Sequence, residues 1–275
     1  MEPSRSNSLN SLADSLARLS QSAGIVGTEP SSCDIHGGFI ASRLRDGQLT
    51  GCPECSRARQ AAQQAEERAE QQRQAVAARL ERLLGQALIP PRFKTKTFEN
   101  YWVQTDKQRT ALEACRRYAE RFPENLGSGR CLMLLGQVGN GKTHLAAAVA
   151  GVVIEQHRCN AMYTTVSRVC QQVKASYSKE STQSEREALD IFRTPDLLIL
   201  DEVGASYGTD FERMVMFEVI NARYEDVKPT IVISNLGAGA LVDALGDRTV
   251  DRLREGSGVV VVFDWVSARR EVAND

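Results

Sequence analysis

The chain has 275 residues, of which 42% are hydrophobic, and a formal net charge of −1. This length is enough for one sizeable core, with roughly 90 residues left over for smaller modules. A net charge near zero excludes a protein that attracts nucleic acid over its whole surface, so any DNA contact must come from a local patch or an assembled surface. Because no apolar stretch reaches the roughly 18 residues that span a bilayer, we expect no membrane contact and a cytoplasmic location.

Residues 1–20 predict a short amphipathic helix. Four leucines at three- and four-residue steps form one apolar stripe: Leu9, Leu12, Leu16 and Leu19. A helix this short is rarely stable alone, so the stripe needs a partner. That partner is either the rest of this chain or another protein that receives the helix in a groove. Residues 21–31 are rich in serine and glycine and predict a flexible linker.

A Cys/His cluster follows. Cys33 and His36 form one pair, Cys52 and Cys55 form a second, and two residues separate the members of each pair. This spacing is typical of a closed tetrahedral Zn²⁺ site, in which each pair forms a turn on one side of the metal. We therefore predict a zinc-binding module over residues 32–56, with a structural metal that folds a segment too small for its own core. The alternative is a reduced surface loop without metal.

The next segments predict a spacer and the start of the main domain. Residues 57–85 consist mostly of Ala, Gln, Glu, Arg and Leu, a composition typical of a long exposed helix. The dyad Pro90-Pro91 ends this helix, and the nearby lysines and arginine predict a basic hinge over residues 86–97. We expect the main domain to occupy residues 98–275.

The string from Gly136 to Thr143 reads G-x-x-x-x-G-K-[ST], a loop whose backbone N–H groups cradle phosphates. In such a loop the lysine, here Lys142, reaches the β- and γ-phosphates, and the hydroxyl of Thr143 holds Mg²⁺. The apolar run 131–135 precedes the loop as a buried strand does, and strong helix formers occupy residues 144–150. The motif requires this strand, loop and helix context, so the sequence predicts an α/β nucleotide-binding domain.

Two acids end another apolar run. Asp201 and Glu202 would lie at the C-terminal edge of a parallel strand, where open α/β sheets bind ligands. There Asp201 would hold Mg²⁺, directly or through water, while Glu202 would polarise the water that attacks the γ-phosphate. Asn235 follows a further predicted strand and is suited to sense or orient that water. The sequence therefore predicts ATP hydrolysis as well as ATP binding.

A helical segment with three arginines, residues 247–254, precedes a last apolar strand at 259–263. Such arginines commonly pair with neighbouring acids. Alternatively, one of them projects into an adjacent subunit and stabilises transition-state charge as an arginine finger.

In this order the motifs resemble the AAA+ ATPases of the DnaC helicase-loader group, including phage-encoded relatives. The resemblance covers residues 98 to about 270 and is carried by the Gly-Asn-Gly-Lys-Thr-His-Leu-Ala run of the loop, the Leu-Leu-Ile-Leu-Asp-Glu-Val-Gly segment, Ser234-Asn235 and the Asp-Arg-Thr-Val-Asp-Arg segment. It implies a parallel sheet between helices and an ATPase that places a hexameric DnaB-type replicative helicase on single-stranded DNA. It also implies self-association, helicase binding through the N-terminal region, and control of assembly and release by nucleotide state.

The same resemblance assigns individual residues. For ATP it implies Gly136, Gly139, Asn140, Gly141, Lys142, Thr143, His144, Arg248 and Arg269, and for magnesium it implies Thr143 and Asp201. For catalysis it implies Asp201, Glu202, Asn235 as the first sensor, and Arg252 as the arginine finger. For single-stranded DNA it implies a helical insertion near residues 167–181, with Lys174, Tyr177 and Lys179 as two phosphate partners and one stacking ring. The alternative for this insertion is a solvated amphipathic helix.

Other functions remain open from the sequence. A transposition helper ATPase of the IstB type has nearly the same core but acts with a transposase on duplex DNA. An initiator of the DnaA type needs a helix-turn-helix after the core, and we expect the few residues after Trp265 to be too short for one. An alternative from a different class is a zinc-containing adaptor that binds a helicase and carries a vestigial ATPase. The intact Lys142, Thr143, Asp201 and Glu202 argue against that reading.

Overall fold

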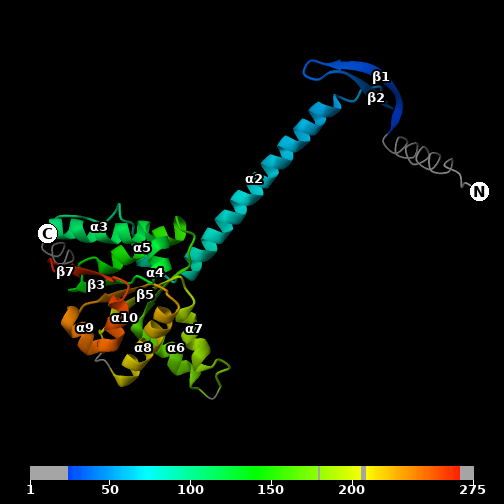
Figure 1. The fold of residues 1–275 in the computed structure, drawn as a ribbon. Helices are drawn as coiled ribbons and strands as arrows, with labels where there is room; N and C mark the ends of the chain where they lie inside the picture. The colour runs from blue at the N-terminus through cyan, green and yellow to red at the C-terminus, as the bar shows by residue number, and fades with distance from the viewer. Residues whose placement is uncertain (1–23, 179, 206–208, 267–275) are drawn as a thin grey trace, which may run out of the picture. The chain divides into compact units, whose positions relative to one another are not determined.

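The computed structural model describes residues 24–178, 180–205 and 209–266 of a chain that divides into two compact units, Met1–Val76 and Ala77–Asp275 (Figure 1). The division falls inside one long helix, α2 (Pro53–Gln86). The helix predicted over residues 1–20 lies outside the described residues and stays a prediction. No helix of the described part of the chain is both long and apolar enough to cross a membrane.

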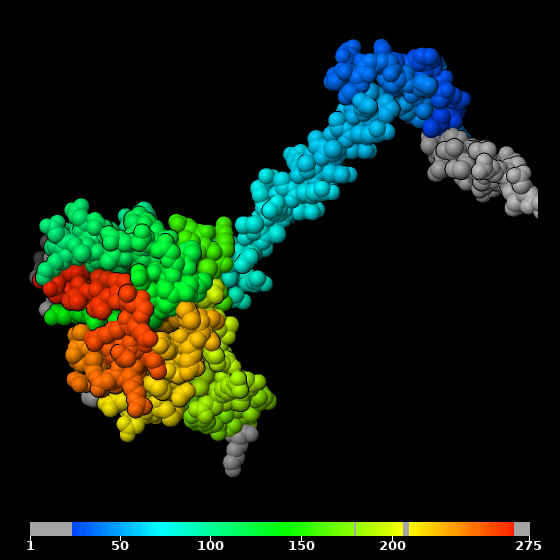
Figure 2. Space-filling model, in the orientation of Figure 1, coloured from blue at the N-terminus to red at the C-terminus, as the bar shows by residue number. Residues whose placement is uncertain are grey.

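The described part of the first unit is a β-hairpin followed by the start of α2, drawn in blue to cyan in the space-filling view of Figure 2. Strand β1 (Ile25–Cys33) pairs antiparallel with β2 (Gly37–Leu44), and Cys33 lies opposite Gly37 at the turn. The flexible linker predicted over residues 21–31 is therefore wrong from Ile25 onward. The serines and glycine that suggested a linker are tolerated because most of β1 is exposed on this small hairpin, and pairing with β2 satisfies its backbone groups.

The second unit is built on a five-stranded sheet in the order β4-β5-β6-β3-β7, with every described pairing parallel. The strands are short apolar runs, as expected for parallel strands that are covered on both faces. Their bounds are β3 (Leu132–Gly136), β4 (Ala161–Thr165), β5 (Leu197–Val203), β6 (Thr230–Ser234) and β7 (Val259–Phe263). The predicted fold class, a parallel sheet between helices, is confirmed.

Helices cover both faces of this sheet (Figure 1). Side chains of a strand alternate between faces, and in β3 Leu132 and Leu134 belong to one apolar cluster while Met133 and Leu135 belong to the other. The first cluster is completed by α3 (Asp106–Glu120), α4 (Phe122–Ser128) and α5 (Lys142–Glu155). The second is completed by α6 (Val166–Ser176), α7 (Glu185–Arg193), α8 (Asp210–Glu225), α9 (Ala238–Leu245) and α10 (Asp247–Arg254).

The segment that joins α2 to the sheet is packed rather than hinge-like. Ala87 is 0% exposed, Ile89 is 8% exposed, and the carbonyl oxygen of Ala87 accepts a hydrogen bond of 2.8 Å from the backbone N–H of Tyr163 in β4. A short 3₁₀ turn, η1 (Pro91–Phe93), follows. The hinge predicted over residues 86–97 is therefore wrong: the prolines end α2, but the apolar residues around them are buried against the core. The second unit accordingly begins at Ala77 and not at residue 98.

A buried arginine ties together the amino ends of the strands. Arg223 of α8 is 0% exposed and donates to carbonyl oxygens of Phe192, Arg193, Pro195, Asp196 and Pro229, and to the hydroxyl of Thr230. Burial lowers its pKa to about 10. These bonds fix α8 against the turns that lead into β5 and β6. Periodicity alone did not predict this role, because an arginine in a helix normally lies on the solvated face.

Candidate functional site

A glycine-rich loop joins β3 to α5 at the C-terminal edge of the sheet. Gly136 has a φ of 137°, and a Cβ there would lie 2.2 Å from the carbonyl oxygen of Phe263 in β7. Gly141 has a φ of 88°, and a Cβ there would lie 2.7 Å from ring carbon Cε2 of Tyr101. Both positions therefore require glycine. The loop leads into the N-terminus of α5, where unpaired N–H groups and the helix dipole favour an anion.

Lys142 is the first residue of α5 and is only 5% exposed. Its ammonium group donates hydrogen bonds of 2.6 Å to the carbonyl oxygen of Gly136 and 2.7 Å to that of Gln137. Burial lowers the pKa of Lys142, and the nearby Asp201 carboxylate opposes this shift. The cation is thus held over the loop by carbonyl groups, within reach of an anion bound there.

Asp201, near the end of β5, is the centre of a hydrogen-bond network. Its Oδ2 accepts 2.9 Å from the hydroxyl of Thr143 and 2.6 Å from the phenol of Tyr163, and its Oδ1 accepts 2.7 Å from the backbone N–H of Glu202. Burial, followed by the bond to Asp201, raises the pKa of Tyr163, so the phenol stays protonated and donates. The network places a hydroxyl and a carboxylate oxygen side by side, which is a donor set that Mg²⁺ prefers.

The backbone of β5 is irregular at the second acid. Glu202 has a φ of 61°, in the left-handed region that a glutamate rarely adopts, and the β5–β6 register shifts between Leu200 and Val203. At this bulge Asp201 is buried while the Glu202 side chain is exposed. Strained backbone of this kind persists only where its surroundings determine it, and it is concentrated at functional sites.

These groups line one cleft of about 480 Å³. The predicted residues that line it are Gly139, Asn140, Gly141, Lys142, Thr143, His144, Asp201, Glu202 and Asn235. Asn235 stands directly after β6, the strand between β5 and β3, so the loop, the acids and the amide lie at the C-terminal edge of neighbouring strands. The sequence missed Arg92, Phe93, Lys96 and Tyr163, which also line the cleft. Three of these four belong to the segment that was predicted as a hinge.

Two further loop residues make contacts within the fold. Asn140 is 3% exposed, and its amide nitrogen donates to the carbonyl oxygens of Phe263 (3.0 Å) and Trp265 (2.6 Å). These two hydrogen bonds attach the phosphate loop to the end of β7. His144 lies with Nε2 2.8 Å from the carbonyl oxygen of Thr97 and its ring against the edge of Tyr101. Burial lowers the pKa of His144, so the neutral ring donates this hydrogen bond from Nε2.

The arginines predicted in α10, Arg248 and Arg252, do not line this cleft. Arg252 lines a different cleft, of about 380 Å³, together with residues such as Cys131 and Thr230 at the amino ends of β3 and β6. Arg248 is exposed on α10, and Arg269 lies outside the described residues. Arg252 is therefore at the opposite edge of the sheet from the phosphate loop of its own chain.

The residues predicted to contact DNA lie in and just after α6. The ammonium of Lys174 is 5.0 Å from the ring centre of Phe211, and the ring of Tyr177 meets the same phenylalanine edge-on at 6.4 Å. The phenol of Tyr177 donates 2.6 Å to Glu185, and 52% of Tyr177 remains exposed. Lys179 lies outside the described residues. Lys174 and Tyr177 thus share one aromatic neighbour, Phe211, which the sequence did not single out.

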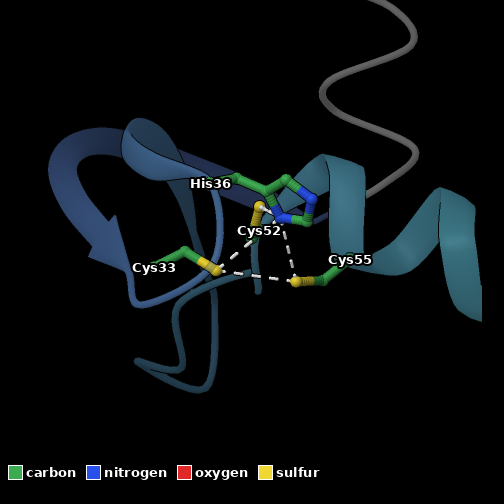
Figure 3. Close-up of side chains that lie close together, drawn as sticks. All are labelled: Cys33, His36, Cys52 and Cys55. Carbon is green, nitrogen blue, oxygen red and sulfur yellow. Dashed lines mark hydrogen bonds between the residues drawn. The ribbon is translucent and has the colours of Figure 1, made fainter.

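The four predicted metal ligands converge in the first unit (Figure 3). Their Sγ and Nδ1 atoms all lie within 4.8 Å of one another. Cys33 Sγ is 3.5 Å from Cys55 Sγ, and His36 Nδ1 is 3.3 Å from Cys55 Sγ and 3.6 Å from Cys52 Sγ. Zinc bonds of about 2.3 Å to sulfur and 2.05 Å to nitrogen in a tetrahedron imply ligand separations of about 3.6–3.8 Å. The separation of Cys33 Sγ from Cys55 Sγ and those of the three sulfurs from His36 Nδ1 span 3.3–3.9 Å, close to this geometry.

Local structure explains how the cluster is built. Cys33 ends β1 and His36 lies in the hairpin turn, while Cys52 precedes Pro53, the first residue of α2. Proline at this position needs no N–H partner and starts the helix that carries Cys55. Hydrogen bonds from the backbone N–H groups of the turn lower the pKa of Cys33 to about 6, while the hydrogen bond to Cys33 raises the pKa of Cys55 to about 11, so the first thiolate of this pair forms on Cys33. We call this hairpin with the first turn of α2, residues 25–55, the Cys/His module.

A carboxylate stands behind the histidine of the module. His36 Nε2 lies 3.7 Å from a carboxylate oxygen of Glu54, on the opposite side of the ring from Nδ1. Metal-binding histidines commonly have such a partner, which fixes the ring orientation. The module therefore contains four converging ligand atoms and a carboxylate 3.7 Å from the second ring nitrogen of its histidine.

Comparison with known proteins agrees with this geometry. The family of IstB-like ATP binding proteins matches residues 57–262. Over 199 residues the chain is 32% identical to the replicative helicase loader DnaC of Buchnera aphidicola subsp. Schizaphis graminum, which covers 72% of this chain and 79% of that protein. It is 30% identical over 196 residues to DnaC of Escherichia coli K12, with 71% and 78% covered.

Solved structures share the fold of the second unit. A crystal structure of the DnaC helicase loader superposes with a TM-score of 0.57 at 22% identity and covers 63% of this chain and 99% of that one. A DnaI crystal structure gives 0.54 at 20% identity. The parallel sheet, phosphate loop and paired acids define a P-loop ATPase of the AAA+ class. The chain belongs to the family of IstB-like ATP-binding proteins and DnaC-type replicative helicase loaders, and it is an ATPase.

Proposed function

We propose that this protein is an ATP-dependent loader that places a DnaB-type hexameric replicative helicase on single-stranded DNA, with nucleotide state controlling assembly and release. The observation that carries the proposal is the 32% identity to a replicative helicase loader over 79% of that protein's length. The cleft supports it, because the groups needed for ATP binding and hydrolysis are intact in this chain.

In the ATP cycle the loop N–H groups and Lys142 bind the phosphates, and the Thr143 hydroxyl and Asp201 hold Mg²⁺. When bound, Mg²⁺ would neutralise charge on the phosphates. Glu202 polarises the attacking water, and Asn235 orients or senses it at the end of the neighbouring strand. The exposure of Glu202 beside the buried Asp201 suits these two roles, since the base must reach water while the metal ligand must be fixed.

The Cys/His module binds Zn²⁺ as a structural site. Three sulfur ligands and one nitrogen ligand within 4.8 Å of one another suit Zn²⁺, and four protein ligands leave no place for a catalytic water. We assign the N-terminal region, including this module, to helicase binding. Its metal would fix the surface that the hairpin offers to that partner.

Hydrolysis depends on self-association in this proposal. Arg252 lies at the opposite sheet edge from the phosphate loop of its own chain, so as an arginine finger it would serve the nucleotide of a neighbouring subunit. Lys174 and Tyr177 would contact single-stranded DNA by charge and stacking along the resulting assembly. ATP hydrolysis would then depend on the assembly of several copies side by side on DNA.

Co-purification with the host's DnaB-type helicase tests this function, with a transposase of the IstB-associated type as the competing bait. We expect the full chain to retain the helicase and to raise helicase loading on protein-coated single-stranded DNA in the presence of ATP. The Lys142→Ala variant should retain the helicase but lose ATP binding and ATP-dependent loading. If the chain retained only the transposase, the protein would instead be a transposition helper. If the Lys142→Ala variant loaded the helicase at the native rate, the protein would be an adaptor that works without an ATP cycle.

A further inference from the structure

The side chain of Arg252 is held by two neighbours at the edge of its cleft. The guanidinium carbon lies 4.2 Å from the ring centre of Tyr224 in α8, a cation–π contact. On α10's C-terminal side, Nη1 of Arg252 lies 3.7 Å from a carboxylate oxygen of Glu255. A hydrogen bond to the same Glu255 raises the pKa of Tyr224, so the phenol stays protonated. Three groups from α8 and the end of α10 therefore contact one another.

The two contacts differ in strength and direction. The pair with Glu255 is long, and both side chains are more than a third exposed, so solvent screens it. The guanidinium carbon lies over the Tyr224 ring, and this contact does not use the N–H donors, which can still bind an anion. A phosphate of higher charge can replace Glu255 at those edges, while the ring contact persists.

The ring itself stands on a rigid base. Tyr224 directly follows Arg223, the fully buried residue that is bonded to the turns before β5 and β6. Near the same edge, Arg252 belongs to α10, which packs on α8 (Figure 1). A side chain that is fixed by such an anchor can orient a flexible arginine at little entropic cost when a ligand arrives.

We propose that Tyr224 is a positioning residue for Arg252, which holds the guanidinium in the direction that meets the nucleotide cleft of a neighbouring copy of this chain. The inference rests on the proposed role of Arg252 as a finger in trans. It adds that the finger is pre-formed: its face is on the Tyr224 ring before a neighbour arrives, and Glu255 is the exchangeable counter-ion that the incoming phosphate replaces.

Mixed subunits of the full-length chain test this. The acceptor is Arg252→Ala, which keeps its own phosphate loop and Glu202 but offers no finger. The donor is Glu202→Gln, which offers a finger but cannot activate water. Neither variant has both a finger and a working catalytic glutamate. ATP hydrolysis by a mixture of the two, in the presence of single-stranded DNA, therefore requires an Arg252 side chain that acts on the cleft of another subunit. Each donor is also made with Tyr224→Phe or with Tyr224→Leu, and hydrolysis is followed against ATP concentration.

We expect the donor with native Tyr224 to restore hydrolysis. The Tyr224→Phe donor should restore the same rate within about twofold, because the aromatic ring is kept. The Tyr224→Leu donor should give a kcat lower by about ten- to a hundredfold, the cost of misplacing a catalytic group by about 1 Å. KM for ATP should not change, because the acceptor's own cleft binds the nucleotide. A merely structural role would instead alter the donor's melting temperature or its own ATP affinity, which are measured alongside.

The outcomes distinguish failure of the positioning role of Tyr224 from failure of the finger role of Arg252. Full restoration by Tyr224→Leu, or equal loss with Tyr224→Phe, overturns the positioning role while leaving Arg252 as a finger in trans. Absence of restoration by the donor with native Tyr224 overturns the finger in trans and this inference with it. Helicase retention by the native chain is measured separately and is unaffected by either result.

Discussion

The two units of the chain hold their functional groups in place by opposite means. Around the phosphate loop the groups stand on strands such as β3 and β5, whose residues Leu134 and Ile199 are 0% exposed. Among the described residues of Met1–Val76, the buried hydrophobic side chains are Ala41 and Cys52 alone. A segment with so little core cannot readily offset the entropy of folding, which is why we propose that a metal bound by the Cys/His cluster contributes to its geometry.

The ATP cleft and the Cys/His module should therefore differ in whether they keep their shape when the ligand is removed. The ATP cleft is positioned by two apolar clusters and by hydrogen bonds such as those of Arg223, and none of these depends on nucleotide. The Cys/His module is positioned by the cluster itself. In the proposed function, nucleotide would therefore act as a switch in a stable domain, whereas zinc would be part of the structure of its own module.

The largest expected effect follows from breaking the module. Cys52→Ser removes one of four ligands, so the chain should lose its zinc and the hairpin should become sensitive to protease, since structural zinc contributes on the order of 10 kcal/mol to such modules. ATP affinity should remain within about twofold of native, because the cleft belongs to the other unit. Elemental analysis, limited proteolysis and nucleotide titration measure the three effects.

Cys159→Ser is the matched control for that change, because Cys159 is a partly exposed cysteine outside the cluster. It should keep one zinc per chain and the native cleavage pattern. If Cys52→Ser kept its full zinc content, the module would owe its shape to something other than the metal, and the contrast between the two units would disappear.

The second test breaks the frame of the ATPase unit. Arg223→Met leaves five carbonyl oxygens and a hydroxyl without their donor, which should destabilise the unit by about 3 kcal/mol or more and lower Tm by about 6–12 °C. Arg213→Met, an exposed arginine on the same helix, should change Tm by less than about 2 °C. Differential scanning calorimetry compares the two. A small change for Arg223→Met would mean that the buried arginine is not needed for stability.

Sequence predicted the fold well where one signal dominated. The four apolar runs at 131–135, before Asp201, before Asn235 and at 259–263 became strands β3, β5, β6 and β7, and the phosphate loop fell between β3 and α5. Parallel strands are predicted from continuous apolar runs, and the loop has an unusual glycine pattern. The Cys/His spacing likewise predicted which four side chains would meet. In each case a local pattern fixes a local structure.

Prediction failed where long-range packing decides. Residues 25–31 were read as a linker because composition does not reveal pairing with β2, and residues 86–97 were read as a hinge because the burial of Ala87 depends on β4. Tyr163 gave no signal, since a tyrosine in an apolar run is most often core. Its bond to Asp201 joins residues 38 positions apart. Such contacts require the tertiary structure.

A smaller effect is expected from Tyr163 in the ATP cleft. Tyr163→Phe removes the donor that orients the Asp201 carboxylate, so hydrolysis should need about tenfold more Mg²⁺, the usual cost of losing a group that orients a metal ligand. ATP binding without Mg²⁺ should be unchanged. Tyr118→Phe is the control, because that buried phenol donates 2.7 Å to Arg130 and does not line the cleft. An unchanged Mg²⁺ requirement would remove Tyr163 from the site.

The smallest effect concerns pH and His144. Burial lowers its pKa below 6.5, so above pH 6.5 the ring is neutral in both the folded and the unfolded chain, and as pH falls below 6.5 the unfolded chain takes up the proton first. The stability gained from the neutral ring is therefore lost with acidification. His144→Gln does not titrate, so the difference in Tm between native and variant should shrink from pH 7 to pH 5.5. A constant difference would mean that the pKa of the ring is the same in the folded and the unfolded chain, and a growing difference would mean that the fold favours the charged ring; in either case the bond to Thr97 does not select the neutral form.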